Sequence, residues 1–436
     1  MEQQHFLQLL KKEMMIAMGC TEPAAAALAG AKACEVLACQ VETLVVSASR
    51  DMVKNAMDVG LPNCSLRGIQ AAVALGAAGG DCGKGLAILS EISEEQKRAA
   101  LNMAQQRKIS LVLVDEVPPV YIAVEAFSEG HRALAVISGE HDRFAFISRD
   151  GQTLVDIGLA PSVGESPEGS FSRELLANLS LKEIVNFAQQ MEPDGLDFVL
   201  QGAYTNLALG EHAMEHSYGL SVGKTMGEGL PKEPRDLSEA YALGAAYAAA
   251  ASDARMAGCP LPVVINSGSG NQGITVSVPL VILARHLQSS ESDLKKALCV
   301  SELVALVLTA RKDRLSALCG AFTAAIGTTC GMVSLLGGDL EVMDRAVNTM
   351  VANLTGIICD GAKTTCALKI HSCVEAASMS CRLAFHGLSP REESGIVGKD
   401  ALQSISYLSR ISHEGMEQTD RTILSIMMAK QEKCGI

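Results

Sequence analysis

The scarcity of aromatic side chains limits the kind of core that this chain can build. Phe, Tyr and Trp together make up 3% of the 436 residues, and Trp is absent, although hydrophobic residues make up 48%. Glycine and methionine are frequent, at 39 and 18 residues, and runs of alanine recur. Small side chains fill a core only when helices pack closely against each other. We therefore expect a folded, largely helical protein, long enough for two or three domains.

Most strand patterns lie in the first third of the chain, although residues 263–265 could form one more strand directly before a Gly-rich loop. Residues 41–47 alternate between apolar and polar side chains, as a half-buried strand does. Further apolar runs bounded by turn residues predict successive strands at residues 109–116, 120–127, 132–138 and 143–148. We expect these four strands to form a compact antiparallel region.

Helical spacing dominates the rest of the chain. Early helices are predicted at residues 6–18, 21–37 and 67–78, and almost everything beyond residue 179 has a helical pattern. A Ser-, Pro- and Gly-rich stretch at residues 161–172 is predicted to be a linker. The sequence thus predicts an α+β fold, in which an N-terminal portion (1–175) with antiparallel strands packs on a larger, mainly helical domain (176–436).

The charge of the chain excludes some partners. A net charge of −13, with no basic stripe, argues against nucleic acid or an anionic membrane. The N-terminus does not have the basic and then apolar pattern of a secretory signal, and 14 cysteines in so long a chain are not the disulfide framework of a small secreted domain. Small polar residues interrupt the uncharged run 315–338, which we predict to be a buried helical hairpin rather than a membrane span. We expect a cytoplasmic protein with a small substrate, and homo-oligomer formation stays open.

Two cysteines of the segment 356–366 lie in a glycine-punctuated turn. Cys359 and Cys366 follow two further cysteines, Cys319 and Cys330. Thiolates are soft ligands that select iron–sulfur clusters or zinc, so this pattern indicates a metal or cluster site. Other cysteines have mostly alanine- or leucine-rich neighbours and are interpreted as packing residues: Cys34, Cys39, Cys64, Cys82, Cys259, Cys299, Cys373 and Cys381.

Another cysteine lies in the motif Gly19-Cys20-Thr21-Glu22-Pro23, directly before an alanine-rich helix. Thr21 is the predicted N-cap, and proline is tolerated in the first turn. Cys20 is then at a helix N-terminus, where the helix dipole lowers the pKa of a thiol. The alternative is that Cys20 only packs beneath the turn.

Residues 266–273 form a Gly-rich loop with the sequence NSGSGNQG. Its accessible amides and the Ser and Asn side chains suit a carboxylate or phosphate. A dinucleotide fingerprint is not indicated, because no series of parallel βαβ units follows. Gly223-Lys224-Thr225 lacks the upstream glycine of a P-loop. His212, Glu215 and His216 match a metallopeptidase pattern and leave a zinc hydrolase as an alternative.

Several of these segments together resemble the L-cysteine desulfidase family. The matching segments are Gly19-Cys20-Thr21-Glu22-Pro23, Val59-Gly60-Leu61-Pro62-Asn63, the loop 266–273, Cys319, Cys359-Asp360-Gly361-Ala362-Lys363 with Cys366, and residues 395–400 and 412–416. That family is related to the catalytic chain of the iron–sulfur L-serine dehydratases. The resemblance spans nearly the whole chain.

The resemblance implies a [4Fe–4S] cluster bound by Cys319, Cys359 and Cys366, and a reactive cysteine at Cys20. Three ligands leave one iron open to act as a Lewis acid. Cys330 is a rival for one ligand position. Cys434 is a further alternative, because some serine dehydratases fold a C-terminal cysteine into the site.

The implied reaction is the β-elimination of L-cysteine to sulfide, pyruvate and ammonia. Cys20 is the expected base with Glu22 as its polar partner. The loop would bind the substrate carboxylate through Ser267, Gly268, Ser269 and Asn271, and Lys363 would influence the charge near the cluster. For this, Cys20 has to fold across onto the helical domain.

Other functions stay open at this point. L-serine is the alternative substrate. A non-catalytic iron–sulfur redox sensor could use the same cysteines. A pyridoxal phosphate enzyme could run the same elimination with Lys363 or Lys224 as the cofactor lysine.

Overall fold

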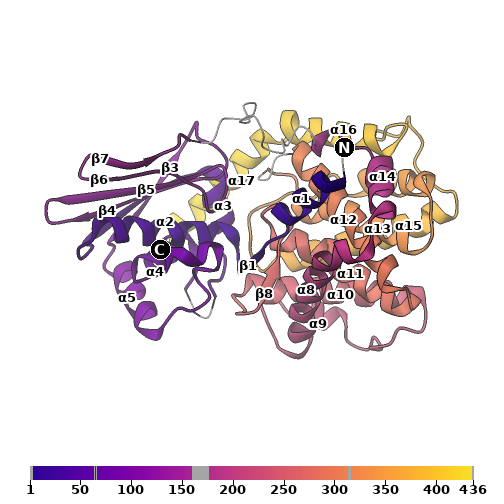
Figure 1. Cartoon of the computed structure of the whole chain (residues 1–436), viewed down its shortest axis with the longest axis horizontal. Coiled ribbons are helices and arrows are strands. Elements are labelled where there is room, and N and C mark those ends of the chain that lie inside the picture. The colour runs from indigo at the N-terminus through magenta and orange to yellow at the C-terminus, as the bar shows by residue number, and fades with distance from the viewer. Residues whose placement is uncertain (1–2, 63, 65, 160–175, 313–315, 435–436) are drawn as a thin grey trace.

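The computed structural model describes residues 3–62, 64, 66–159, 176–312 and 316–434. A twisted sheet with helices on it forms one part of the molecule, and a bundle of helices forms the other (Figure 1). The α+β fold class predicted from the sequence is therefore confirmed.

The sheet has six strands in the order β3-β2-β4-β5-β6-β7. Their bounds are β2 (Thr43–Ser49), β3 (Ile109–Val114), β4 (Tyr121–Ser128), β5 (His131–Ser138), β6 (Phe144–Arg149) and β7 (Gln152–Asp156). From β4 to β6 each strand pairs antiparallel with the next, as predicted. Strand β7, which was not predicted, pairs antiparallel with β6, whereas β3 pairs parallel with β2. The prediction of an antiparallel region beginning at Ile109 was wrong there. A parallel neighbour needs a crossover connection, and α3 (Arg50–Ala56), α4 (Gly68–Ala77), η1 (Cys82–Ala87) and α5 (Glu94–Gln105) supply it.

Helix α2 (Thr21–Leu37) lies against this sheet and is almost entirely buried. It packs on α4 at two glycines that permit backbone contact. A Cβ on Gly76 would lie 1.9 Å from the carbonyl oxygen of Ala27, and one on Gly30 would lie 2.7 Å from that of Val73. The small residues that the sequence analysis emphasised therefore bring α2 and α4 close together.

The helical part is built around long buried helices. They are α8 (Asp197–Glu215), α10 (Leu237–Met256), α11 (Gly270–Leu287), α12 (Glu291–Lys312), α13 (Gly320–Leu335), α14 (Leu340–Leu354) and α15 (Cys366–Phe385). Shorter helices complete it: α7 (Leu181–Gln190), η2 (Pro193–Leu196), α9 (Val222–Met226), α16 (Ala401–Arg410) and the π-helical turn η3 (Ile411–Gly415). The prediction of a helical hairpin was wrong, because the described part of that run, residues 316–338, contains one buried helix, α13, and the next helix begins only at Leu340. Within the described ranges, no helix has the length and apolar character that crossing a membrane requires.

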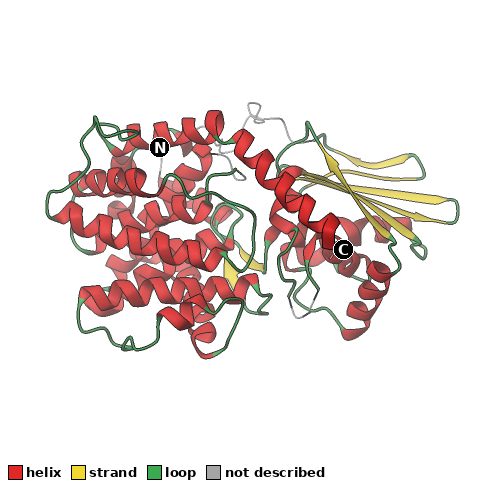
Figure 2. Ribbon diagram, turned by 180° about the vertical axis from the view of Figure 1, so that it is seen from behind, coloured by secondary structure: helices red, strands yellow, loops and turns green. Residues whose placement is uncertain are grey.

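Two terminal segments pack on the opposite part of the molecule from their sequence neighbours. Phe6, Leu9 and Leu10 of α1 (Gln3–Glu13) belong to the core of the helical part. Leu424 of α17 (Glu417–Cys434) belongs to the core beneath the sheet, and Figure 2 shows this helix running from one part to the other. The predicted linker 161–172 lies outside the described residues, so the division at residue 175 stays a prediction.

A small second sheet joins the chain's N-terminal region to the helical part. Strand β1 (Ile16–Met18) pairs antiparallel with β8 (Pro262–Val264). The prediction of one helix over residues 6–18 was therefore wrong for its last turn. The apolar spacing of Ile16 to Met18 is satisfied equally well by a short strand, and α1 ends at Glu13.

Candidate active site

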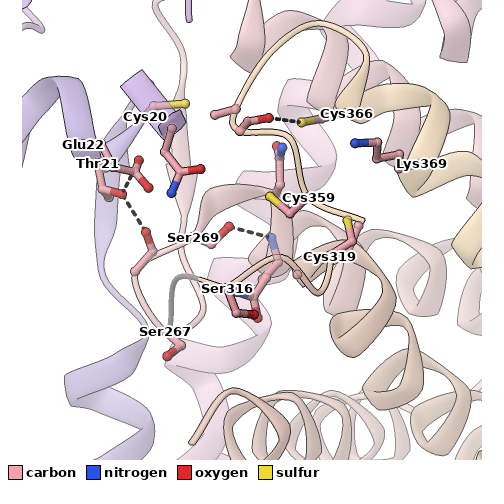
Figure 3. A pocket seen from close by; sticks show the side chains of 18 of the residues that line it. Cys20, Thr21, Glu22, Ser267, Ser269, Ser316, Cys319, Cys359, Cys366 and Lys369 are labelled. Carbon is pink, nitrogen blue, oxygen red and sulfur yellow. Dashed lines mark hydrogen bonds between the residues drawn. The ribbon is translucent and has the colours of Figure 1, made fainter. Parts of the chain in front are cut away.

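A single cavity is lined by all nine residues that the sequence analysis proposed for catalysis, substrate binding or cluster binding. They are Cys20, Glu22, Ser267, Gly268, Ser269, Asn271, Cys319, Cys359 and Cys366. Figure 3 shows Cys20, Thr21 and Glu22 on one side of the cavity, and Cys319, Cys359, Cys366 and Lys369 on the other. We call these the Cys20 wall and the three-cysteine wall. Their chemical roles stay predictions.

The Cys20 wall is positioned by the pairing of β1 with β8. Cys20 follows β1, and the Gly-rich loop follows β8, so strand pairing brings both to the same place. Beyond the strands, the Ser267 amide donates to the Glu13 carbonyl (3.2 Å) and the Thr21 hydroxyl donates to the Gly268 carbonyl (2.7 Å). The folding of Cys20 onto the helical domain, required by the proposed chemistry, is thus achieved by backbone hydrogen bonds.

Cys20 is the N-cap of α2, and Thr21 is the first helical residue. The predicted cap was therefore wrong by one residue, because the Thr21 hydroxyl is used to hold the Gly-rich loop. The expected direction of the thiol pKa was also wrong. Burial raises the pKa of Cys20 to about 12, and the nearby charge of Arg255 offsets only part of this. The thiol form of Cys20 is favoured at neutral pH.

The three-cysteine wall is formed by segments far apart in sequence. Leu318 and Ile358 form an isolated antiparallel bridge. The Cys319 amide donates to the Ile357 carbonyl (3.1 Å), and the Cys359 amide donates to the Ala317 carbonyl (2.6 Å). Cys366 begins α15, and its thiol lies 3.7 Å from the Gly361 carbonyl. Cys319 is the N-cap of α13, so two cysteines of this wall lie at helix N-termini.

Gly361 shapes the turn between Cys359 and Cys366. Its φ of +94° is a conformation that residues with a side chain rarely adopt. A Cβ on Gly361 would also lie 2.1 Å from the carbonyl oxygen of Lys54. The turn thus packs directly on α3.

Two lysines provide positive charge near the three thiols. Lys369 lines the cavity, pairs with Asp360 and donates to the Ile358 carbonyl (3.0 Å). Lys54, with 1% of its side chain exposed, pairs with Asp420 of α17. Burial alone would lower the pKa of Lys54, but Cys359, Asp51 and Asp420 together raise it above its ordinary value.

Cys319 is buried, Cys359 and Cys366 are half-buried, and neighbouring thiols oppose the ionisation of Cys319 and of Cys366. Burial raises the pKa of Cys319 to about 12, with further increases from Cys359 and Cys366. Burial likewise raises the pKa of Cys366 to about 11. Their mutual influence shows that the three sulfurs share one electrostatic environment. A cationic ligand would favour the deprotonation of Cys319 and Cys366.

The donor set suits a cluster better than a single ion. In the described part of the chain, no group of three or more His, Cys, Asp or Glu side chains converges closely enough to hold one metal ion. A cluster has several irons, each held by a separate thiolate, so its ligand sulfurs need not converge on one point. Three soft donors from two segments around one cavity therefore fit an iron–sulfur cluster.

Several alternatives from the sequence lie away from this cavity. Cys330 is fully buried in the core within α13 and is not among the lining residues. The His212 ring is hydrogen-bonded to the Tyr218 hydroxyl (2.9 Å), and the His216 ring to the His212 carbonyl (2.8 Å), which does not support the zinc site.

The remaining alternatives concern lysines and the chain end. Lys363 pairs with Asp360 and lies outside the cavity lining, where Lys369 takes the position expected for it. Lys224 donates to the Glu215 carbonyl (3.3 Å) and does not line the cavity. These positions give no support to a pyridoxal phosphate lysine. The side chain of Cys434 is outside what the structure describes.

Sequence reasoning missed other residues of the lining. They are Asn55, His141, Arg255, Lys312, Ser316 and Lys369. Only Arg255 carries a readable signal, since a charged side chain within the alanine-rich run of α10 is unusual for a buried helix. His141 belongs to a segment that the sequence predicts only as a turn.

Comparisons with known proteins identify the family of the chain. Residues 83–425 match the family described as the serine dehydratase alpha chain. A protein of Oleidesulfovibrio alaskensis named UPF0597 protein is 39% identical over 430 residues, covering 99% of each chain. Proteins of the same name from Aeromonas hydrophila (39% over 429 residues, 98% of this chain and 96% of the relative) and Bacteroides thetaiotaomicron (38% over 431 residues, 98% of each) are also similar. These names do not distinguish cysteine from serine as a substrate. Matched over most of its length, the chain belongs to the serine dehydratase alpha chain family.

Proposed function

We propose that this protein is a cytoplasmic L-cysteine desulfidase, a lyase that converts L-cysteine to sulfide, pyruvate and ammonia. Membership of the serine dehydratase alpha chain family supports β-elimination from a small amino acid. The observation that carries the proposal is the single cavity shared by Cys20 and the three cysteines Cys319, Cys359 and Cys366.

Cys319, Cys359 and Cys366 would hold a [4Fe–4S] cluster, as members of this family typically do. When bound by three thiolates, such a cluster supplies one open iron that can act as a Lewis acid toward the leaving group. Lys369 and the paired Lys54 would offset the negative charge of the thiolates on this wall.

Because burial favours the thiol form of Cys20, this thiol would have to lose its own proton before its Sγ atom could accept the Cα proton. A buried thiolate is a strong base, because protonation removes a charge from a poorly solvated site. The Cβ–S bond of the substrate then breaks, and its electron pair leaves with the sulfur. The resulting aminoacrylate takes up water and gives pyruvate and ammonia. The loop residues Ser267, Gly268, Ser269 and Asn271 would keep the substrate carboxylate in place during these steps.

L-serine dehydration is the second candidate, and the matching family's description favours it. The leaving group at the three-cysteine wall would then be the hydroxyl of L-serine in place of the thiol of L-cysteine. The Cys20 motif, which resembles the desulfidases, favours cysteine.

The test is anaerobic reconstitution with iron and sulfide, followed by assays of sulfide and pyruvate release. Equal amounts of both products from L-cysteine are expected, and Cys359→Ala should abolish them. Cys39→Ala is the matched control, because Cys39 is exposed and remote from the lining. Pyruvate from L-serine without sulfide from L-cysteine would establish the dehydratase. A cluster that forms while neither substrate reacts would favour the redox sensor.

A further inference from the structure

Arg255 is a buried cation that faces the cavity without an acidic partner. It belongs to α10 and has 4% of its surface exposed. Its Nε–H donates to the Gly19 carbonyl (3.1 Å), which fixes the plane of the guanidinium. Among the described residues, no Asp or Glu lies within 4 Å of its nitrogens. A buried charge without a partner is costly, so its presence beside a cavity indicates a ligand of opposite charge.

Gly270, the first residue of α11, leaves room for this guanidinium. A Cβ at Gly270 would lie 2.4 Å from Nε and 2.8 Å from Cζ of Arg255. The Ser269 side chain and carbonyl accept from the amides of Gln272 and Gly273, respectively. Of the first amides of α11, those of Gly270 and Asn271 have no partner within the helix. The helix terminus and Arg255 thus present positive charge to the same place.

Glu22, on the same wall, is a buried anion that also lines the cavity without an ion-pair partner among the described residues. It is 9% exposed and lines the cavity. The Thr21 hydroxyl lies 3.2 Å from its carboxylate but donates its shorter bond, 2.7 Å, to the Gly268 carbonyl. No Lys, Arg or His of the described chain lies within ion-pair distance of Glu22. Figure 3 shows its carboxylate beside Thr21 on the Cys20 wall.

We propose that Arg255, with the amides of Gly270 and Asn271, binds the α-carboxylate of the substrate and that Glu22 binds its α-ammonium group. Arginine offers two parallel hydrogen bonds to a carboxylate, a geometry that lysine cannot reproduce. A cation and an anion on one wall select a zwitterionic α-amino acid over a simple amine or a simple acid. This inference rests on the proposed function for its site and identifies the specificity residues within it.

The assignment also changes the role of Glu22. Rather than assisting Cys20 as a polar partner, Glu22 would hold the substrate nitrogen, which keeps the Cα–H bond turned toward Cys20. The Gly-rich loop then contributes mainly through its helix terminus and through the space at Gly270.

The test compares the binding of three unreactive probes to the reconstituted protein by anaerobic isothermal titration calorimetry. L-alanine has both charged groups and no leaving group, ethylamine lacks the carboxylate, and propionate lacks the ammonium group. Losing one partner of a buried charged pair weakens binding by about 30-fold or more. Wild-type protein should therefore prefer L-alanine over both other probes by at least about that factor.

The variants separate the two charges. Arg255→Gln should remove the preference for L-alanine over ethylamine while leaving ethylamine binding unchanged. Arg255→Lys should retain only part of the preference for L-alanine over ethylamine. Glu22→Gln should remove the preference over propionate alone. Gly270→Ala alters no charge yet displaces the guanidinium, so it should reproduce the Arg255→Gln pattern in a protein whose charges are intact.

Three results would contradict the inference. The first is an equal loss of affinity for all three probes in the variants, and the second is an unchanged ratio of probe affinities in Arg255→Gln and Gly270→Ala. The third is a wild-type protein that does not prefer the zwitterion. Thermal melts followed by circular dichroism identify a variant that fails to fold, in which case Gly270→Ala decides. If wild-type protein releases sulfide from L-cysteine and the ratios do not change, this inference alone fails. If the ratios change as expected but neither L-cysteine nor L-serine reacts, the proposed function fails and an amino-acid site remains.

Discussion

The two walls of the cavity differ in whether their charged side chains form ion pairs. On the three-cysteine wall, Lys369 pairs with Asp360, and Lys54, behind it, pairs with Asp420. On the Cys20 wall, Arg255 and Glu22 face the cavity without ion-pair partners among the described residues. Paired charges hold a backbone or tune neighbouring thiols, whereas unpaired buried charges are available to a ligand. The difference supports the proposed roles, with a cofactor on the three-cysteine wall and a substrate on the Cys20 wall.

The largest effect is expected from Gly361→Ala, which changes the backbone of the three-cysteine wall. Alanine rarely adopts the φ of +94° found at this position, and its Cβ would lie 2.1 Å from the carbonyl oxygen of Lys54. The backbone of the turn would therefore have to shift. We expect iron content after reconstitution to fall to near zero, as measured by iron and acid-labile sulfide analysis. Gly356→Ala is the matched control, since a Cβ there meets nothing within 4 Å. Normal iron content in Gly361→Ala would show that the turn does not shape the ligand set.

Lys54→Met tests whether the paired charges of the same wall also hold α17 in place. The substitution leaves Asp420 without its cation and Asp51 without its nearest charge compensation. Breaking a buried pair by removing one partner costs about 3–5 kcal/mol. Denaturant unfolding should show a loss of that order, and adding Asp420→Asn should recover part of it. Additive losses in the double variant would contradict a direct pairing.

Glu302 offers a pH-dependent test of the support behind the Gly-rich loop. Asn266 donates to its carboxylate (2.6 Å), and burial raises the pKa of Glu302 to about 8. Between its ordinary pKa near 4.5 and 8, the folded state binds more protons than the unfolded state. The free energy of unfolding should therefore fall with rising pH in this window, by at most about 1.4 kcal/mol per unit from this group.

The contribution of Glu302 is isolated by subtraction. Glu302→Gln keeps an acceptor for Asn266 but cannot ionise. The difference between wild-type and variant unfolding free energies should therefore slope between pH 5 and 8 and become flat above it. A difference independent of pH would mean that Glu302 is ionised in the folded protein throughout this range.

The smallest effect is expected from Thr21→Val on the Cys20 wall. The variant keeps the shape of the side chain but loses the 2.7 Å hydrogen bond to the Gly268 carbonyl. One such bond contributes about 1 kcal/mol. Thr422→Val, on the exposed face of α17 where the hydroxyl bonds only to its own helix, should change stability less. Equal losses of stability in the two variants would show that the hydrogen bond of Thr21 does not hold the Cys20 wall in place.

Sequence patterns located the segments that form the cavity. Chemistry-bearing residues such as Cys20 and Cys359 lie in short segments rich in Gly, Thr and Asp, which stand out against the surrounding alanine-rich helices. Such local contrast is visible without a fold. The same reasoning missed Arg255, because an isolated cation near the end of a long alanine-rich helix does not reveal which distant segments it will face.

Local patterns were weakest where a distant segment decides the outcome. Residues 16–18 have spacing compatible with a helix, but pairing with residues 262–264 makes them a strand. Ile109 begins a strand as predicted, yet its direction relative to β2 depends on the crossover that precedes it.

The sequence by itself determined the fold class, the close packing of small side chains and the relation to the serine dehydratase alpha chain family. These follow from local composition and motifs, which do not depend on where distant segments lie. Only the tertiary structure decided that Cys20 is a buried thiol with a raised pKa, since burial by neighbours outweighs the local helix terminus. It also decided which charges are paired and which are left for a ligand, because ion pairs such as Lys54 with Asp420 join residues that only folding brings together.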